Sequence, residues 1–211
     1  DLEDIQGKRI LLRVDFNTPL TEPDENGYRE VADDTRIREA LPTINYLLEK
    51  EVKLIIISHL GRPKGKVVDE LRLDPVARAL ESLLEKPVKK IDAITSDTVH
   101  KEVEEMKAGD ILMLENIRFR EEEENCDMQY TKELSTLGDV FVNDAFGTAH
   151  RKHASTAGLA EYIPAYAGLL MEKEIEELSK VLDNPGHPLT IIFGGAKMDS
   201  KIGVIKNFIG K

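Results

Sequence analysis

Short apolar runs alternate along the chain with stretches whose apolar residues repeat at the helical period. The runs are rich in Ile, Val and Leu, which is typical of strands. They cover residues 9–14, 54–58, 111–114, 140–142 and 189–193, with a weaker run at 88–91. The run at 54–58 (LIIIS) does not alternate with polar residues, as in a strand that is buried on both faces of a parallel sheet.

Helix-period segments separate these strands. Between 34 and 50 the apolar residues form one stripe, with Asp33 or Asp34 as a candidate N-cap. Pro42 lies inside this segment and is expected to kink or divide the helix. Further helices are predicted to begin at Asp74, to span 97–107, 130–137 and 169–182, and to begin near Ser200.

Strands that alternate with helices indicate βαβ units and a mostly parallel sheet. The fold class is therefore α/β, with helices on both faces of the sheet in three layers. Asn184-Pro185-Gly186 interrupts the pattern after the long helix at 169–182. The segment that follows is too short for a stable domain of this kind, so we expect it to be the beginning of a second one.

Composition and charge disfavour several classes of protein. The net charge of −11 disfavours a nucleic-acid-binding protein, which would need a basic field. No apolar run approaches the roughly 18–20 residues of a membrane-spanning helix, and residues 1–9 do not resemble a secretory signal. Cys126 is the only cysteine and cannot form an internal disulfide, so we expect a reducing, cytoplasmic environment.

Polar residues follow each predicted strand at the point where it ends. In an open α/β sheet, ligands bind outside the carboxyl ends of the strands. These clusters therefore favour one binding site over several unrelated loops. They are Asp15–Asn17, His59–Lys64, Glu115–Arg120, Asn143–His153 and Gly194–Lys197.

Two of these clusters are basic without any acid. Residues 58–66 hold Arg62, Lys64 and Lys66, and residues 146–153 hold Arg151 and Lys152. Arginine binds phosphate and carboxylate groups through two parallel hydrogen bonds. Arginines from separate loops therefore predict a site for a small polyanion. The acidic run at 121–124 is expected to be a solvated loop or the start of a helix.

Several residues also allow other interpretations. His150 and His153 have a spacing that could bind a metal, but no third ligand is evident, so we predict no metal site. The pattern Asp15-x-Asn17 resembles the nucleophile motif of dehalogenase-type phosphatases, in which a second acid occupies the position of Asn17. Residues 194–201 do not match a Walker A motif. Their small residues and two lysines, ahead of a predicted helix, are nevertheless suited to phosphate.

Several segments together resemble the N-terminal half of a phosphoglycerate kinase. They occur in the family's order along nearly the whole chain, and the stretch from Asn143 to Arg151 is specific by itself. The matching segments are RVDFN at 13–17, SHLGRP at 58–63, LENIRF at 114–119, VNDAFGTAHR at 142–151 and FGGAK at 193–197.

The resemblance implies two α/β domains joined by a long helix. It implies a phosphoglycerate-binding domain over 1–168, an interdomain helix over 169–183 and the incomplete start of a nucleotide-binding domain over 184–211. The substrate-binding residues that it implies are Asp15, Asn17, Arg36, His59, Arg62, Arg118 and Arg151. The nucleotide-binding residues that it implies are Gly194, Gly195, Lys197 and Lys201.

The implied reaction is ATP + 3-phosphoglycerate ⇌ ADP + 1,3-bisphosphoglycerate, with Mg²⁺ bound to the nucleotide. Arg36 and Lys197 are then the catalytic residues, on opposite sides of the phosphoryl group that is transferred. We expect a monomer that binds neither nucleic acid nor membranes. The alternatives are an isolated sugar-phosphate-binding module and a dehalogenase-type phosphatase.

Two features depart from the family pattern. The family usually places Asp directly before the second lysine of the glycine-rich segment, whereas here Ser200 precedes Lys201. The chain given ends at Lys211, before the family's later glycine-rich and acidic residues. Contacts to magnesium and adenine are therefore not assigned, and we expect the chain as given to be inactive alone.

Overall fold

The computed structural model describes residues 4–183, 190–192, 194, 202–203 and 205–206. Its contacts group Asp1–Met171 into one compact unit and Glu172–Lys211 into another. The first unit contains the sheet. In the second, residues 202–203 and 205–206 are helical, whereas the predicted helix start near Ser200 lies outside the described residues.

The strand predicted at 189–193 does not form in residues 190–192, which have no regular secondary structure. A strand needs a hydrogen-bonded neighbour, and no strand among the described residues pairs with this segment. Its two ends, Leu189 and Phe193, lie outside the described residues.

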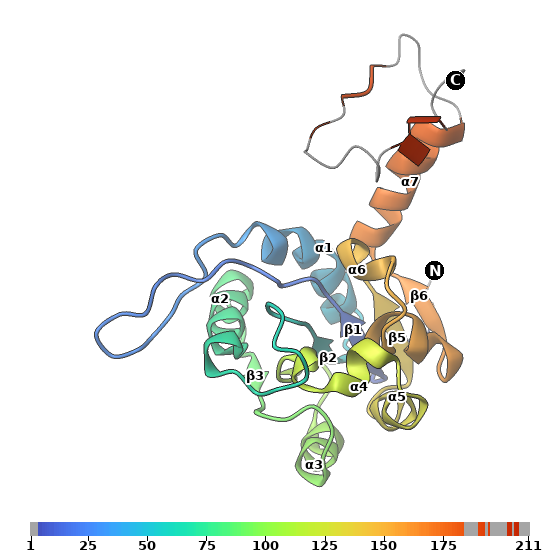
Figure 1. Ribbon diagram of the computed structural model, residues 1–211. Coiled ribbons are helices and arrows are strands. Elements are labelled where there is room, and N and C mark those ends of the chain that lie inside the picture. The colour runs from blue at the N-terminus through green and yellow to red at the C-terminus, as the bar shows by residue number, and fades with distance from the viewer. Residues whose placement is uncertain (1–3, 184–189, 193, 195–201, 204, 207–211) are drawn as a thin grey trace. The chain divides into compact units, whose positions relative to one another are not determined.

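A parallel six-stranded sheet forms the centre of the first unit, in the order β3-β4-β2-β1-β5-β6 (Figure 1). In the central strand, Arg13 lies opposite Ile57 on one side and Asn143 on the other. All strands therefore end at the same edge of the sheet. The strands are β1 Arg9–Arg13, β2 Lys53–Ile57, β3 Lys89–Lys90, β4 Ile111–Met113, β5 Val140–Asn143 and β6 Ala165–Ala167.

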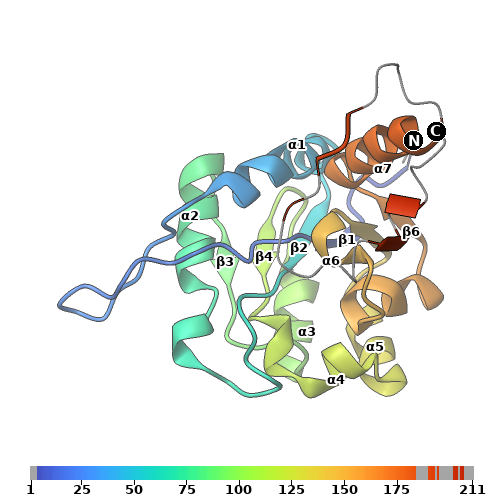
Figure 2. The same cartoon turned by 45° about the horizontal axis from the view of Figure 1, so that its top comes forward.

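Helices cover both faces of this sheet, which confirms the predicted three-layer α/β fold (Figure 2). Successive residues of a strand point to opposite faces. Accordingly, Ile10 and Leu12 belong to one hydrophobic core together with residues of α1 and α2. Leu11 belongs to a second core together with residues of α3 and α5. These helices are α1 Thr35–Glu49, α2 Asp74–Leu84, α3 Asp97–Glu105 and α5 Met128–Ser135.

Pro42 does not divide α1, contrary to one of the two expectations. Apolar side chains are buried in α1 both before and after the proline, at Ile37 and Ala40 and at Ile44 and Leu47. Their burial against the sheet offsets the cost of about 3 kcal/mol that a proline imposes inside a helix.

Local side-chain hydrogen bonds support the starts of α1, α3 and α5. Ser96 accepts the N–H of Val99 at the start of α3, and Asp127 accepts the N–H of Tyr130 at the start of α5. Before α1, the carboxylate of Asp33 accepts the N–H of Thr35 at 2.9 Å. These bonds satisfy backbone donors that have no partner within the helix.

Apart from the start of α4, the short elements between the long ones were not predicted, because they have too few residues to show a hydrophobic period. No helix among the described residues is long and apolar enough to cross a lipid bilayer. The short elements are the 3₁₀ helices Asp69–Leu71, Ile117–Phe119 and Leu159–Glu161, the α-helices α4 Glu121–Asn125 and α6 Phe146–Ala149, and the π-helix Ala154–Gly158. The long helix α7, Leu169–Asp183, agrees with its prediction.

The acidic run at 121–124 begins a helix, which confirms one of the two alternatives, but it is not wholly solvated. Within α4, Glu123 is completely buried. Its carboxylate accepts hydrogen bonds from Ser155, at 2.9 Å from the backbone N–H and 2.6 Å from the hydroxyl. These bonds replace the water that a buried carboxylate loses.

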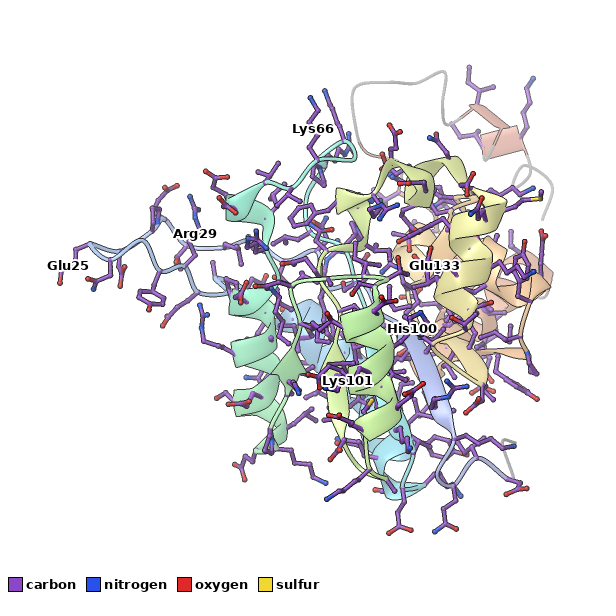
Figure 3. The ribbon with its side chains drawn as sticks, turned by 90° about the horizontal axis from the view of Figure 1, so that it is seen from below. Glu25, Arg29, Lys66, His100, Lys101 and Glu133 are labelled. Atoms are coloured by element: carbon purple, nitrogen blue, oxygen red, sulfur yellow. The ribbon has the colours of Figure 1, made fainter. Side chains whose placement is uncertain are left out.

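An arm projects from the first unit between β1 and α1. Leu20 and Val31 pair as an antiparallel bridge at its base, and Figure 3 shows Glu25 and Arg29 extending along it away from the sheet. The carboxylate of Asp24 accepts the N–H groups of Asn26 and Tyr28 at the turn, each at 2.8 Å.

Candidate functional site

The loops that carry the predicted site residues leave neighbouring strands at one edge of the sheet. Because β4, β2, β1 and β5 are adjacent and parallel, the segments after them begin side by side. The strand order therefore places the polar clusters that begin at Asp15, His59, Glu115 and Asn143 next to one another.

Asp15 and Asn17 connect the loop after β1 to two other elements. Asp15 accepts hydrogen bonds from the backbone N–H of Asn17 at 3.2 Å and from Nη1 of Arg36 at 2.5 Å. The side-chain oxygen of Asn17 accepts the N–H of Gly61 at 2.7 Å. These bonds fix the loop after β1 against α1 and against the loop after β2.

Gly61 allows the loop after β2 to turn beside Asn17. Its φ of +62° is a conformation that residues with a side chain rarely adopt. A Cβ atom there would also lie 2.8 Å from a methyl group of Leu71. The turn therefore favours glycine, and the Gly61 carbonyl accepts a hydrogen bond from Nη1 of Arg118 at 3.0 Å.

Arg118 is buried in the 3₁₀ helix after β4. Its Nε lies 3.4 Å from a carboxylate oxygen of Glu124. Burial lowers the pKa of the Arg118 guanidinium; Glu124 opposes this shift, and the nearby Arg151 adds to it. A buried arginine beside another arginine indicates a place where an anion is favoured.

His59 lies near four arginines, called the arginine cluster below, and is only 3% exposed. Burial lowers the pKa of His59 to about 2, and four neighbouring arginines lower it further. The imidazole is therefore neutral at pH 7, within a strongly positive environment. The four arginines are Arg13, Arg118, Arg151 and Arg36.

Arg62 and the two histidines after α6 are less closely joined to this cluster. Arg62 is exposed and forms no hydrogen bond or ion pair within the described part of the chain. Nε of Arg151 lies 3.3 Å from Nε2 of His150. His150 is exposed, whereas His153 is buried, with Nδ1 3.8 Å from a carboxylate oxygen of Glu123.

Arg13 was not among the predicted site residues. It is fully buried at the end of β1, and its Nη2 lies 3.1 Å from Nδ1 of His59. Its Nε donates to the hydroxyl of Ser155 at 2.9 Å, and its Nη1 donates to the Val14 carbonyl. A charged residue directly after the apolar residues 10–12 was the signal that could have identified it.

The model of the family "Phosphoglycerate kinase" matches residues 1–211. The chain belongs to the phosphoglycerate kinase family. A curated phosphoglycerate kinase from Dictyoglomus turgidum is 58% identical over 209 residues, which are 99% of this chain and 51% of the relative. The chain thus spans about half the length of the curated relative it matches.

Solved phosphoglycerate kinases also share the fold. The structure from Coxiella burnetii has a TM-score of 0.84 at 38% identity, over 98% of this chain and 50% of its own length. The structure from Pyrococcus horikoshii has a TM-score of 0.86 at 35% identity, over 97% of this chain and 50% of its own. The α/β fold is therefore that of phosphoglycerate kinases.

The structure describes only part of the predicted nucleotide segment. Gly194 is exposed. Gly195, Lys197 and Lys201 lie outside the described residues.

One group of carboxylates in the described part of the chain lies close enough together to hold a metal: Asp74, Asp92 and Glu115. The ammonium group of Lys90 already forms hydrogen bonds with all three. Arg72 also donates to Glu115, at 3.1 Å. This cluster is therefore satisfied by cations of the chain itself and does not fit Mg²⁺.

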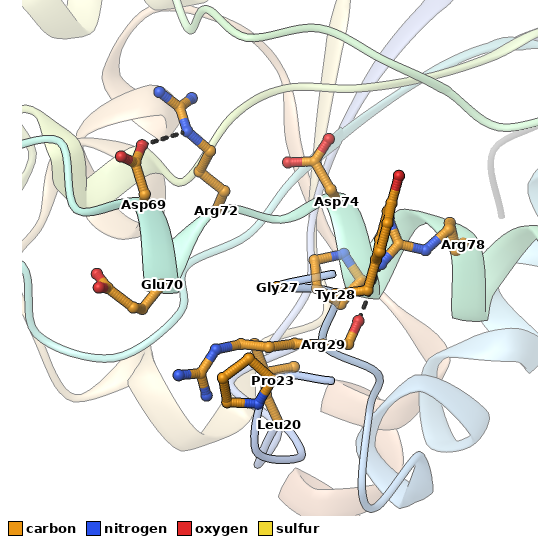
Figure 4. Close-up of a pocket in the computed structure, with 11 residues that line it drawn as sticks. Leu20, Pro23, Gly27, Tyr28, Arg29, Asp69, Glu70, Arg72, Asp74 and Arg78 are labelled. Atoms are coloured by element: carbon orange, nitrogen blue, oxygen red, sulfur yellow. Dashed lines mark hydrogen bonds and ion pairs between the residues drawn. The ribbon is translucent and has the colours of Figure 1, made fainter. Parts of the chain in front are cut away.

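A separate hollow of about 470 Å³ lies between the arm and α2 (Figure 4). Basic and acidic side chains line it in equal measure, so it has no net attraction for an anion. It contains none of the predicted substrate-binding residues. Its charged residues are Arg29, Arg72, Arg78, Asp69, Glu70 and Asp74.

Proposed function

We propose that the complete protein transfers a phosphoryl group between ATP and 3-phosphoglycerate, and that residues 1–168 bind the phosphoglycerate. The observation that carries this proposal is the group of arginines around a neutral, buried His59 at the carboxyl edge of the sheet. A small acid with a carboxylate and a phosphate supplies the negative charge that such a site lacks.

The substrate's own chemistry determines what the site must do. The carboxylate of 3-phosphoglycerate is already ionised at pH 7, so no general base is required. Catalysis then depends on holding the reactants in line and on stabilising the charge of the phosphoryl group in transit. Arginines on a rigid sheet edge are suited to both tasks.

Within this proposal, Asp15, Asn17, His59, Arg62, Arg118 and Arg151 bind the phosphoglycerate. Arg36 is the catalytic residue of this half of the site. Its side chain is 52% exposed although it is held by Asp15, so its remaining N–H groups can reach a phosphoryl oxygen. His59 donates a hydrogen bond and does not carry charge at pH 7.

The magnesium–nucleotide complex is the second substrate. We assign its phosphates to Gly194, Gly195, Lys197 and Lys201, with Lys197 as the catalytic residue of this segment. Residues 169–183 then connect the two domains, and residues 184–211 begin the nucleotide-binding domain. We expect a cytoplasmic monomer, in keeping with the lone Cys126.

Titration calorimetry of the complete protein tests the substrate assignment. The wild-type protein should bind 3-phosphoglycerate, and Arg151→Ala should weaken binding by about tenfold or more. Arg29→Ala removes the same group from the arm, away from the predicted site, and should bind normally. Equal affinity in all three proteins would contradict the assignment.

A coupled assay for 1,3-bisphosphoglycerate formation tests the reaction itself. Binding without turnover would instead support a sugar-phosphate-binding module. Release of phosphate from phosphoglycerate, abolished by Asp15→Ala, would support the phosphatase. The family assignment favours the kinase.

A further inference from the structure

A continuous line of hydrogen bonds runs from His59 into the interior of the first unit. Nδ1 of His59 lies 3.1 Å from Nη2 of Arg13, and Nε of Arg13 lies 2.9 Å from the hydroxyl of Ser155. The hydroxyl of Ser155 lies 2.6 Å from a carboxylate oxygen of Glu123. These side chains come from β1, the loop after β2, α4 and the π-helix.

The donors along this line can be assigned from chemistry. Arginine has only donors, so Arg13 must donate to both the imidazole and the serine. Nδ1 of His59 therefore accepts, and the proton of the neutral ring is on Nε2. The Ser155 hydroxyl, having accepted from Arg13, donates its own hydrogen to Glu123.

Three of these side chains are buried, so an unpaired charge among them would be energetically unfavourable. Arg13, Ser155 and Glu123 are each fully buried. Burial lowers the pKa of Arg13 and raises the pKa of Glu123, and each charge opposes the shift of the other. An unpaired charge here would have lost its hydration without compensation, so the two charges depend on Ser155 between them.

The surrounding backbone holds the line in place. The N–H of Ser155 donates to the second carboxylate oxygen of Glu123 at 2.9 Å. At the start of the π-helix, the hydroxyl of Thr156 accepts the N–H of His153 at 3.1 Å. Short π-helical segments are rare and occur often at functional sites.

We propose that Glu123 and Ser155 are positioning residues, which orient Arg13 so that His59 presents its Nε2–H group to an anionic oxygen of the substrate. Neither residue touches the substrate in this arrangement. The identity of that substrate rests on the proposed function, whereas the hydrogen-bond line does not. The line lies beneath the arginine cluster and connects it to the counter-charge of Glu123.

Nitrogen NMR of the complete protein without substrate tests the proposal. At about pH 5.5, an ordinary histidine is mostly protonated. His59 should instead show an unprotonated Nδ1 and a protonated Nε2, because Arg13, Arg36, Arg118 and Arg151 face it. The Nε–H of Arg13 should exchange slowly with solvent.

Two variants interrupt the line at different points. Ser155→Ala removes the acceptor of Arg13, and Glu123→Gln removes the counter-charge while keeping the shape. Both should move the His59 nitrogen signals, speed the exchange of the Arg13 Nε–H and weaken 3-phosphoglycerate binding by about tenfold. Ser135→Ala removes another buried serine hydroxyl, in α5, and should change none of these.

A protonated Nδ1 in the wild-type protein would overturn the proposal without any variant. Unchanged His59 signals in folded Ser155→Ala would overturn it as well. If the wild-type protein binds no 3-phosphoglycerate, the proposed function fails. The NMR signals then still show whether the line of hydrogen bonds from His59 to Glu123 exists.

Discussion

The carboxylate of Asp15 accepts a hydrogen bond of 2.5 Å from Nη1 of Arg36, which joins the loop after β1 to the first turn of α1. Asp15 is mostly buried, with 16% of its side chain exposed, whereas 52% of the Arg36 side chain is exposed. Asp15 thus holds Nη1 of the Arg36 guanidinium and leaves the rest of that side chain accessible to solvent. This geometry suits a group that must meet a second reactant.

Replacing Arg36 should affect turnover more than binding. In the complete protein, Arg36→Ala is expected to lower kcat on the order of 100–1000-fold, about 3–4 kcal/mol, as for loss of one donor to transition-state charge. Affinity for 3-phosphoglycerate should remain near normal. Steady-state kinetics and calorimetry together separate the two effects.

Arg38→Ala is the matched control for this prediction. Arg38 is on the same helix, is also exposed and pairs with Asp34. Its removal should leave kcat unchanged. An Arg36→Ala enzyme with normal kcat would exclude Arg36 from the mechanism.

The burial of His59 predicts how stability depends on pH. The folded protein holds the pKa of His59 at about 2, against 6.5 for an ordinary histidine, chiefly through burial and then through Arg13. Between these values the unfolded chain binds a proton that the folded protein does not. His59 therefore makes the protein less stable as the pH falls from about 6.5 toward 2.

His59→Gln should remove this contribution. The free energy of unfolding of wild type should change with pH more steeply than that of the variant, by about 1.4 kcal/mol per pH unit. Urea denaturation at several pH values below 6 measures both slopes. Equal slopes would show that His59 accepts a proton in the folded state.

Asp144 secures the start of α7. One of its carboxylate oxygens accepts the N–H groups of Leu170 at 2.9 Å and Met171 at 3.1 Å. Asp144→Ala should reduce stability by about 1–2 kcal/mol, as for loss of a helix cap. Asp144→Asn keeps an acceptor, and because burial raises the pKa of Asp144, the neutral amide has less to lose on desolvation.

Denaturant unfolding of the complete protein should therefore rank the variants in the order wild type, Asp144→Asn, Asp144→Ala. An asparagine variant as unstable as the alanine variant would show that the charge matters, and not the acceptor.

Two neighbouring lysines of β3 should differ sharply in their contribution to stability. The side chain of Lys90 is 9% exposed and forms an ion pair with Glu115, which is 3% exposed. Lys90→Met removes one partner of this buried pair and should cost about 3 kcal/mol, near the low end for such pairs because Arg72 still reaches Glu115.

Lys89→Met is the control. Lys89 is 61% exposed and pairs with Glu102 at the surface, so its loss should cost less than about 1 kcal/mol. Similar unfolding free energies for the two variants would contradict the assigned role of Lys90.

The local pattern was sufficient for much of the fold. The stripe from Ile37 to Leu48 predicted α1, because residues three and four apart share one face of a helix. The run LIIIS predicted a central strand, because a strand covered on both faces has no polar alternation. Short elements such as α6 and β6 were not predicted, because so few residues cannot show a hydrophobic period.

Sequence alone determined which polar residues follow each strand, and hence which loops could form a site, because the chain direction of parallel strands places all their carboxyl ends together. Tertiary structure alone decided which of these residues meet. The strand order brings Arg13 beside His59, and it turns Glu123, one of four identical neighbours in sequence, into a buried partner of Ser155. That choice depends on contacts between residues distant in the chain, which no local pattern of hydrophobic and polar positions records.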